Sequence, residues 1–244
     1  MSDAFSLKRL RRLTARLVPH RWVWAEDNRD AIAQNWNRRR AAAPNMFDGS
    51  VLLACACRIE GDACDVDLFE TAYSRFLGFR DAGSPDSTVT NAFAAVVPWT
   101  ADGAALLGIM GCHTANAGQA YFPCGTPDRN DLRDGDCVDL AGSALRELRE
   151  ETGIVLEPSI VLEPGKPEDW VLVSGHGQRA FLRPIRFAED SATLLARMEA
   201  HRQAEKAPEL AGFLAARGPS DIDAARMPGF VRAYLAHEFS GRYG

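Results

Sequence analysis

Residues 139–154 read Asp139-Leu-Ala-Gly-Ser-Ala-Leu-Arg-Glu-Leu-Arg-Glu-Glu-Thr-Gly153-Ile, and this stretch decides the fold of the 244-residue chain. Asp139 is of a type that caps the N-terminus of a helix, and Gly153 is of the type that ends one in the left-handed conformation. Apolar residues recur between them at helical spacing: Leu140, Ala141, Ala144, Leu145 and Leu148. The stretch therefore predicts an amphipathic helix that packs against a sheet.

Three carboxylates share one side of this helix. At about 100° per residue, Glu147, Glu150 and Glu151 fall within an arc of about 100°. They repel one another, and Arg146, four residues before Glu150, offsets only part of that repulsion. Such acid-rich runs are usually ordinary solvated faces, but a hard dication such as Mg²⁺ would neutralise this one.

The rest of the chain is predicted to alternate between strands and helices, which indicates an α/β fold. Residues 1–50 are polar and are predicted to be helical, and 212–216 fit a strand or a helical turn. The expected strands are 51–59 with 63–69 as hairpin partner, 88–99 with 104–110 after an Asp-Gly turn, 170–173 and 179–187. The expected further helices are 191–206 and 228–239.

The residues Arg146 to Ile154 resemble the second half of the Nudix box, REUxEExGU with U aliphatic. Upstream, Tyr121-Phe122-Pro123-Cys124-Gly125 resembles the aromatic-Phe-Pro-Gly-Gly segment that leads into that box. The resemblance implies an α/β/α sandwich with a mixed sheet, and a hydrolase that cleaves diphosphate linkages. We expect residues 85–244 to form this domain and residues 1–84 to form an N-terminal α+β extension.

The upstream spacing departs from the family pattern. In the full box the first Gly precedes the Arg by 14 positions, whereas Gly125 precedes Arg146 by 146 − 125 = 21, an insertion of seven residues. The isolated Glu of the box, which commonly braces the Arg, would fall at Val138. Asp136 or Asp139 is a candidate replacement, although neither is in register.

The resemblance implies roles for the box residues. Glu150 and Glu151 would ligate Mg²⁺, with Mn²⁺ as the alternative, and Glu147 would be a further ligand or the base that activates water. Arg146 would orient the carboxylates, and the backbone near Gly125 would complete the metal site. Some members take the base from a later loop, for which the candidates are Glu205 and Glu209.

Substrate-binding candidates lie outside the helix. The insert residues Asp128, Arg129 and Asp131 are expected near the site, where loops set specificity, although a solvated loop explains them equally well. Residues 43–49 and 71–78 resemble the N-terminal region of UDP-sugar pyrophosphatase-like Nudix proteins. Arg80, two residues beyond them, is a further substrate-binding candidate. A nucleotide sugar is therefore favoured as substrate, with a coenzyme A derivative or a dinucleotide as alternatives.

Composition narrows the function class. The net charge of −5 argues against a nucleic-acid partner, and no apolar run reaches the ~20 residues of a membrane helix. The six cysteines form no zinc-site spacing and are expected to be reduced thiols of a cytoplasmic protein. The expected partner is a small nucleotide, and a homodimer stays open. The rival interpretation is a non-catalytic nucleotide-sensing Nudix module.

Overall fold

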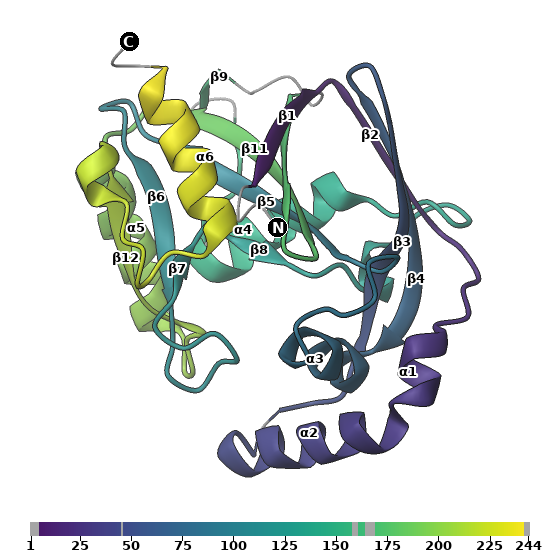
Figure 1. The fold of residues 1–244 in the computed structure, drawn as a ribbon. Coiled ribbons are helices and arrows are strands. Elements are labelled where there is room, and N and C mark those ends of the chain that lie inside the picture. The colour runs from purple at the N-terminus through teal and green to yellow at the C-terminus, as the bar shows by residue number, and fades with distance from the viewer. Residues whose placement is uncertain (1–4, 45, 158–160, 164–168, 242–244) are drawn as a thin grey trace.

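The computed structural model describes residues 5–44, 46–157, 161–163 and 169–241, and shows an α/β chain with two sheets (Figure 1). The large sheet runs in the order β1 (Ser6–Leu10), β10 (Trp170–Gly175), β11 (Gln178–Phe187), β5 (Asn91–Trp99), β6 (Ala105–Met110) and β12 (Leu210–Ala216). Three short strands extend it: β7 (Ala120–Tyr121) on β6, β8 (Cys124–Gly125) on β5 and β9 (Val161–Glu163) on β11. The pair β11 and β5 is parallel and the other pairs are antiparallel, so the sheet is mixed.

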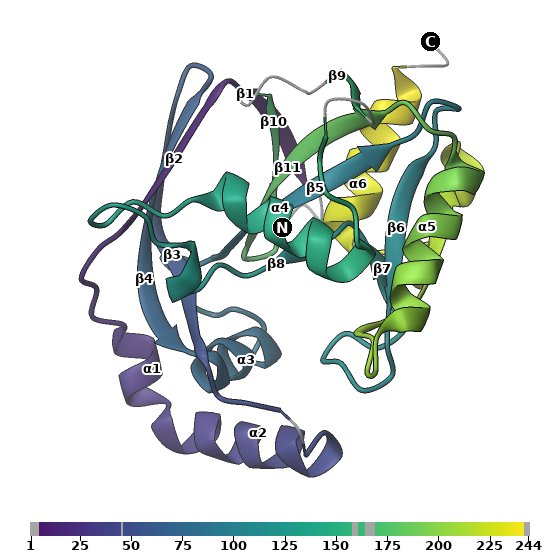
Figure 2. The ribbon, with the colours of Figure 1, turned by 180° about the vertical axis from the view of Figure 1, so that it is seen from behind.

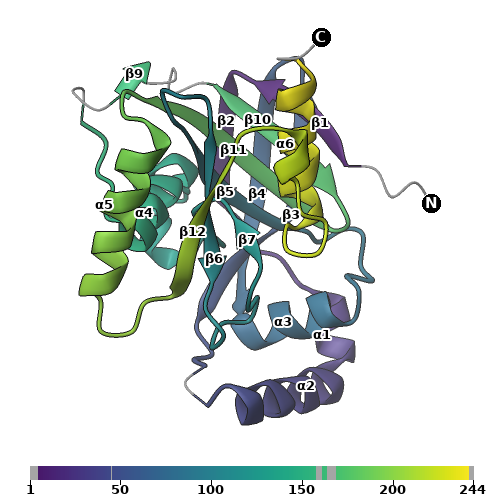
Figure 3. The same cartoon turned by 90° about the vertical axis from the view of Figure 1, so that its left-hand side faces the viewer.

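Helices cover both faces of the large sheet (Figures 1 and 3). On one face lie α4 (Leu140–Thr152) and α5 (Ser191–Ala204), whose Leu148, Leu194 and Met198 join one buried cluster. On the other face lies α6 (Gly229–Ser240), which buries an apolar stripe in a second cluster. This confirms the predicted α/β/α sandwich with a mixed sheet.

The small sheet has the order β2 (Arg12–Leu17), β4 (Ala63–Ala72) and β3 (Ser50–Glu60). One of its faces contributes to the cluster that contains α4, through residues such as Leu52, Val66 and Leu68. Its other face packs on α1 (Val23–Asp27), α2 (Arg29–Ala42) and α3 (Tyr73–Asp81). The two sheets therefore share a core, and Figure 2 shows α4 between them.

The prediction that residues 1–50 are helical is wrong at the start of the chain. Residues 6–10 form an edge strand of the large sheet and residues 12–17 form a strand of the small one. In Arg12-Leu-Thr-Ala-Arg-Leu17 the apolar residues alternate with polar ones, and this period of two is the strand signal that the interpretation missed. Residues 6–10, which the sequence groups with the extension, thus belong to the large sheet.

The other predicted elements lie close to their expected positions, whereas α3 and β9 were not predicted. The β3–β4 and β5–β6 hairpins, β10, β11, α5 and α6 fall where expected, and residues 210–216 are a strand. All six cysteines are free thiols. Within the described ranges, no helix is long and apolar enough to cross a membrane.

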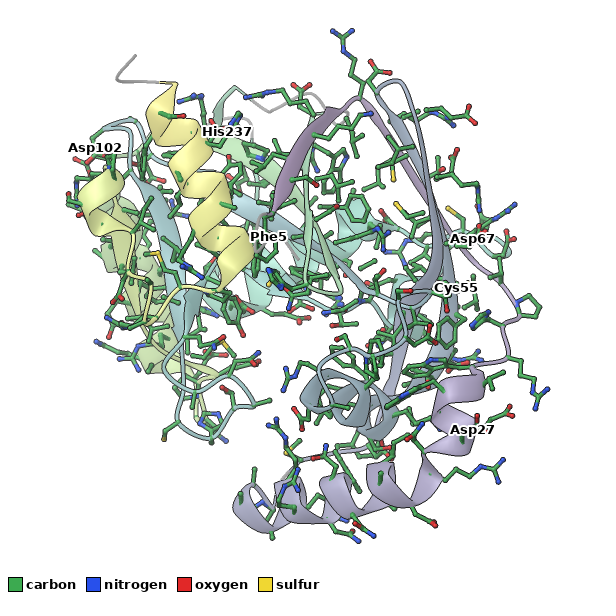
Figure 4. All side chains as sticks on the ribbon, viewed as in Figure 1. Phe5, Asp27, Cys55, Asp67, Asp102 and His237 are labelled. Atoms are coloured by element: carbon green, nitrogen blue, oxygen red, sulfur yellow. The ribbon has the colours of Figure 1, made fainter. Side chains whose placement is uncertain are left out.

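Asp102 fixes the β5–β6 turn to the first turn of α5 (Figure 4). Its carboxylate accepts hydrogen bonds from Ser191 N at 2.9 Å and Ser191 Oγ at 2.6 Å, and also from the Thr100 hydroxyl. These hydrogen bonds, first that of Ser191, lower the pKa of Asp102 to about 2. A carboxyl with a lowered pKa contributes stability above its unfolded pKa and loses it as the pH falls through the folded pKa.

We therefore expect Asp102→Asn to reduce the free energy of unfolding more at pH 7 than at pH 3. Urea unfolding of both proteins at the two pH values measures this difference. An equal effect of the substitution at both values would show that the charge of Asp102 contributes nothing.

Candidate functional site

The predicted helix is α4, with the predicted ends. The Asp139 side chain accepts a hydrogen bond from Gly142 N at 2.7 Å, and Gly153 closes the helix at φ 71°. Ala144 and Leu148 are fully buried, and the helix packs on β5 and β8. This packing directs Glu147 and Glu151 toward the backbone of Cys124 and Gly125.

Glu151 is buried, and Glu147 is largely buried, with 16% of its side chain exposed. Only 8% of Glu151 is exposed, and the Cys124 backbone hydrogen-bonds to it. Burial, followed by the charges of Glu147 and Glu209, raises the pKa of Glu151 well above its ordinary value. Burial likewise raises the pKa of Glu147 to about 7, against the opposing charge of Arg146. Two acids one helical turn apart thus lie where their negative charge is poorly solvated.

Glu150 lies at the edge of this group. Its side chain is 51% exposed and pairs with Arg146, whose Nη1 lies 3.2 Å from Glu150 Oε2 and 2.8 Å from Glu147 Oε1. Because Arg146 stands between these two carboxylates, no group of three acidic, His or Cys side chains in the described part of the chain already surrounds a common point.

Asp131 braces Arg146, and sequence reasoning missed this role. Its carboxylate is 1% exposed, lies 3.3 Å from Arg146 Nη2 and accepts hydrogen bonds from Ser143 Oγ and Asp128 N, each at 3.0 Å. A side chain buried with these partners has little surface open to a substrate, so the geometry gives no support to the predicted substrate contact of Asp131.

Neither predicted replacement for the missing Glu performs this task. Asp139 caps α4 and Asp136 is exposed, while Val138 is buried in the core. The sequence signal was obscured because the insert folds back: a short 3₁₀ helix (Arg129–Asp131) brings Asp131 under Arg146 from 15 residues away. The insert is held by the small sheet, through Leu52 N to Pro127 O and Leu17 N to Asp136 O, each 2.7 Å.

The other two insert candidates have local partners. The Asp128 side chain accepts a hydrogen bond from Asn130 N at 2.6 Å and caps the 3₁₀ helix. Arg129 pairs with Glu70 on β4. Neither lines the large pocket described below, so their predicted contact with substrate gains no support from the geometry.

The structure has room only for a glycine at position 125. A Cβ at this position would lie 2.6 Å from Glu147 Cδ. Its hydrogen-only side chain therefore lets the Glu147 carboxylate approach the backbone of β8.

We expect Gly125→Ala to displace the Glu147 carboxylate. If the chain is the hydrolase that the sequence predicts, the kcat of this variant should fall by about tenfold or more, because small misplacements of a catalytic group are costly. Its melting temperature should stay near that of the wild type, since the displaced group is the end of a side chain. The matched control is Gly212→Ala, where an added Cβ meets nothing within 4 Å. Equal activity of the two variants would contradict the role of Gly125.

A pocket of about 1140 Å³ adjoins the carboxylates. Cys124, Gly125 and Glu209 lie along one part of its wall, and α3 contributes another part with Arg80. Of the two candidate loop bases, Glu209 therefore lines the pocket, whereas the exposed Glu205 does not.

Glu209 lines the pocket and is exposed to solvent there. Partial burial raises its pKa; the charge of His113 opposes this effect, and the charges of Glu205 and Glu150 add to it. The Glu209 charge also raises the pKa of both Glu147 and Glu151. The three acids thus act on one another electrostatically.

The pocket also contains aromatic residues that sequence reasoning did not assign to a site: Phe5, Tyr73, Phe76, Phe93, Tyr121 and Phe230. They come from β4–α3, β5, β7 and the start of α6, with Phe5 beside that helix end (Figure 4). No local motif joins residues so far apart, so only the tertiary fold shows that they share a wall.

Comparisons with known proteins gave structural matches alone. No protein-family model matches the sequence, and no curated protein matches it. A Nudix hydrolase from Nitrosomonas europaea is 17% identical, over 62% of this chain and 90% of that one, with a TM-score of 0.38. A MutT protein from Methanosarcina mazei is 15% identical over 62% and 94%, also with a TM-score of 0.38. A Nudix hydrolase from M. smegmatis is 13% identical over 62% and 84%, with a TM-score of 0.35. Similarities at this level assign no activity, so the function is argued from the site.

Proposed function

We propose that this chain is a metal-dependent Nudix-type hydrolase that cleaves a diphosphate linkage in a nucleoside diphosphate derivative. The observation that carries the proposal is the burial of Glu147 and Glu151 together, against the backbone of Cys124 and Gly125, beside a large pocket. Buried acids with raised pKa values in a cleft are typical of functional sites rather than of solvated helix faces.

The donor set fits a hard dication. Carboxylate and backbone carbonyl oxygens are the ligands that Mg²⁺ and Mn²⁺ prefer, and the described residues supply one close cation, Arg146, for Glu147 and Glu150 together. Glu147, Glu150 and Glu151 would hold the metal, with the backbone near Gly125. When bound, the metal would supply charge neutralisation for the diphosphate and acidify a water molecule.

The chain's own residues perform the remaining tasks. Arg146, fixed by Asp131, holds the carboxylates of Glu147 and Glu150 in position. Glu209 lines the pocket and can accept a proton from the attacking water, and Glu147 is the alternative base. The bond between the attacked phosphorus and the bridging oxygen would break, and the other phosphate would leave as a monoester.

The pocket supports a substrate larger than a mononucleotide. Its volume of about 1140 Å³ exceeds the roughly 300–1,000 Å³ typical of small-ligand sites. A nucleotide sugar is the favoured class because the N-terminal extension, where the sugar-nucleotide resemblance lies, contributes Tyr73, Phe76 and Arg80 to the wall. Coenzyme A derivatives and dinucleotides are the alternatives.

A nucleotide sensor is the second candidate function. It is favoured by the position of Arg146, which pairs with two of the three box carboxylates. In a sensor, Arg146 would keep this position with nucleotide bound, and no turnover would follow.

The experiment is product release from UDP-sugars, ADP-ribose, dinucleotides, coenzyme A and nucleoside triphosphates, each with Mg²⁺, with Mn²⁺ and with EDTA. We expect turnover of one class, led by nucleotide sugars, that EDTA abolishes. Saturable nucleotide binding without turnover of any compound would favour the sensor.

A further inference from the structure

The wall that α3 contributes to the pocket has a cation with unused hydrogen-bonding capacity. Arg80 Nη1 donates to the neutral Asn116 Oδ1 at 3.2 Å, and its guanidinium lies 5.9 Å from the centre of the Phe76 ring. The nearest carboxylate, on Asp81, is 3.8 Å from Arg80 Nε. A guanidinium has five N–H donors, so most of those of Arg80 are left for a pocket ligand.

Asp81 does not neutralise Arg80 because it is already paired. Arg39 binds both of its oxygens, with Nε at 2.8 Å and Nη2 at 2.5 Å, and Asn35 Nδ2 donates to it at 2.9 Å. Among the described residues that line the pocket, the guanidinium groups are those of Arg80 and Arg232. Arg232 is exposed on α6, whereas Arg80 is half-buried on α3. Since the carboxylate end of the pocket repels anions, a second anionic group of a ligand is attracted to a guanidinium such as that of Arg80.

Two aromatic pairs accompany this cation. Tyr73 and Phe76 of α3 lie 6.1 Å apart between ring centres, and Phe93 and Phe230 lie 5.2 Å apart on the body of the molecule. All four rings line the pocket. Of these four residues, Tyr73 is half-buried, whereas the other three are only 4–6% exposed, so Tyr73 offers the ring surface that is open to the pocket. An open ring face beside a guanidinium suits a planar heterocycle that carries a phosphate.

The α3 wall is held rigidly before any ligand binds. Ser74 N donates to Asp48 Oδ1 at 2.7 Å, and Gly78 packs so closely on α2 that an added Cβ would lie 2.9 Å from Ile32 Cγ1. The Gly78 contact and the Arg39–Asp81 pair fix α3 on α2, and the Ser74–Asp48 hydrogen bond ties the start of α3 to the loop after α2. A preorganised wall spends little free energy on ordering when it binds a ligand.

We propose that α3 forms the nucleotide-reading wall of the pocket. There the ring of Tyr73 receives the nucleobase, and Arg80, which lies over the Phe76 ring, binds the phosphate attached to the nucleoside. This inference rests on the proposed function and deepens it, since it assigns the nucleoside half of the substrate to the N-terminal extension. The other half then extends toward Glu147 and Glu151.

The test measures binding, without metal and without turnover. Calorimetric titration in EDTA compares uridine and adenosine monophosphates with the corresponding nucleosides. We expect Arg80→Gln to weaken monophosphate binding about tenfold or more, equal to about 1.4 kcal/mol, and to change nucleoside binding less than twofold. Arg80→Lys, which keeps the charge but loses the fork of donors, should fall between the two.

Two further variants complete the design. Tyr73→Ala should weaken the monophosphates and the nucleosides together, because it removes a stacking surface. Arg75→Gln, an exposed arginine on the same helix that does not line the pocket, should change neither. Wild-type monophosphate affinity in the Arg80→Gln variant, or wild-type protein that binds no nucleotide, would overturn the assignment of α3. If monophosphate binding depended on Arg80 but the protein showed no hydrolytic turnover, the assignment of α3 would stand and the proposed hydrolase function would be rejected.

Discussion

Glu151→Gln is expected to lower kcat for the diphosphate substrate by about 10²–10³-fold, with little change in the affinity for nucleoside monophosphates. The substitution replaces a buried carboxyl, which would ligate the proposed metal in its charged form, with a neutral amide. Steady-state kinetics at saturating Mg²⁺ measures the loss.

The stability of the same variant separates catalysis from structure. The raised pKa of Glu151 means that its charged form is unfavourable in the folded chain, so a neutral amide should leave the melting temperature unchanged or raise it. Glu205→Gln is the matched control, since Glu205 is exposed and lies outside the pocket. A Glu151→Gln protein that melts far below the wild type but retains turnover would show a structural carboxylate instead.

Asp131→Ala is expected to cost about 2–4 kcal/mol in the free energy of unfolding, or roughly 5–12 °C in melting temperature. It leaves Ser143 Oγ and Asp128 N without their acceptor and takes a partner from Arg146. Turnover should fall as well, because Arg146 then loses the contact that orients it toward Glu147. Thermal and urea unfolding measure the first effect, and kinetics below the melting transition measures the second.

The control for this prediction lies in the same loop. Asp134 is exposed, and Asp134→Ala should stay within about 0.5 kcal/mol of the wild type in stability and keep full turnover. If Asp131→Ala matched Asp134→Ala in both measurements, Asp131 would not brace Arg146.

Much of the fold was readable because its signals are local. The Asp139 cap, the Leu140–Leu148 stripe and the Gly153 stop fix α4 within a few residues of sequence, and the same holds for the β3–β4 hairpin. The start of the chain was misread because β1 pairs with β10, with Leu10 opposite Trp170, so its partner is 160 residues away. Charged side chains on β1 and β2 concealed the strands.

The features of the site likewise divide into those with a local sequence signal and those that depend on the tertiary fold. The box carboxylates were predicted from the resemblance of residues 146–154 to the Nudix box, and Glu209 was a candidate, with Glu205, because of its place in a later loop. The role of Asp131 was missed because it depends on how the insert folds back on the small sheet, which no spacing rule encodes. The aromatic wall was missed because Tyr73, Phe93 and Phe230 meet only through packing between elements distant in sequence.

The central claim, that water attacks a diphosphate at the Glu147–Glu151 site, is tested most directly by reaction in ¹⁸O-labelled water with Mg²⁺. The substrate is the compound that turns over in the panel. The account predicts two phosphate monoester products, one of which carries a single ¹⁸O on its phosphorus, and no products with EDTA or in Glu151→Gln. Label absent from both phosphates, or product formation that persists in EDTA and in Glu151→Gln, would contradict it.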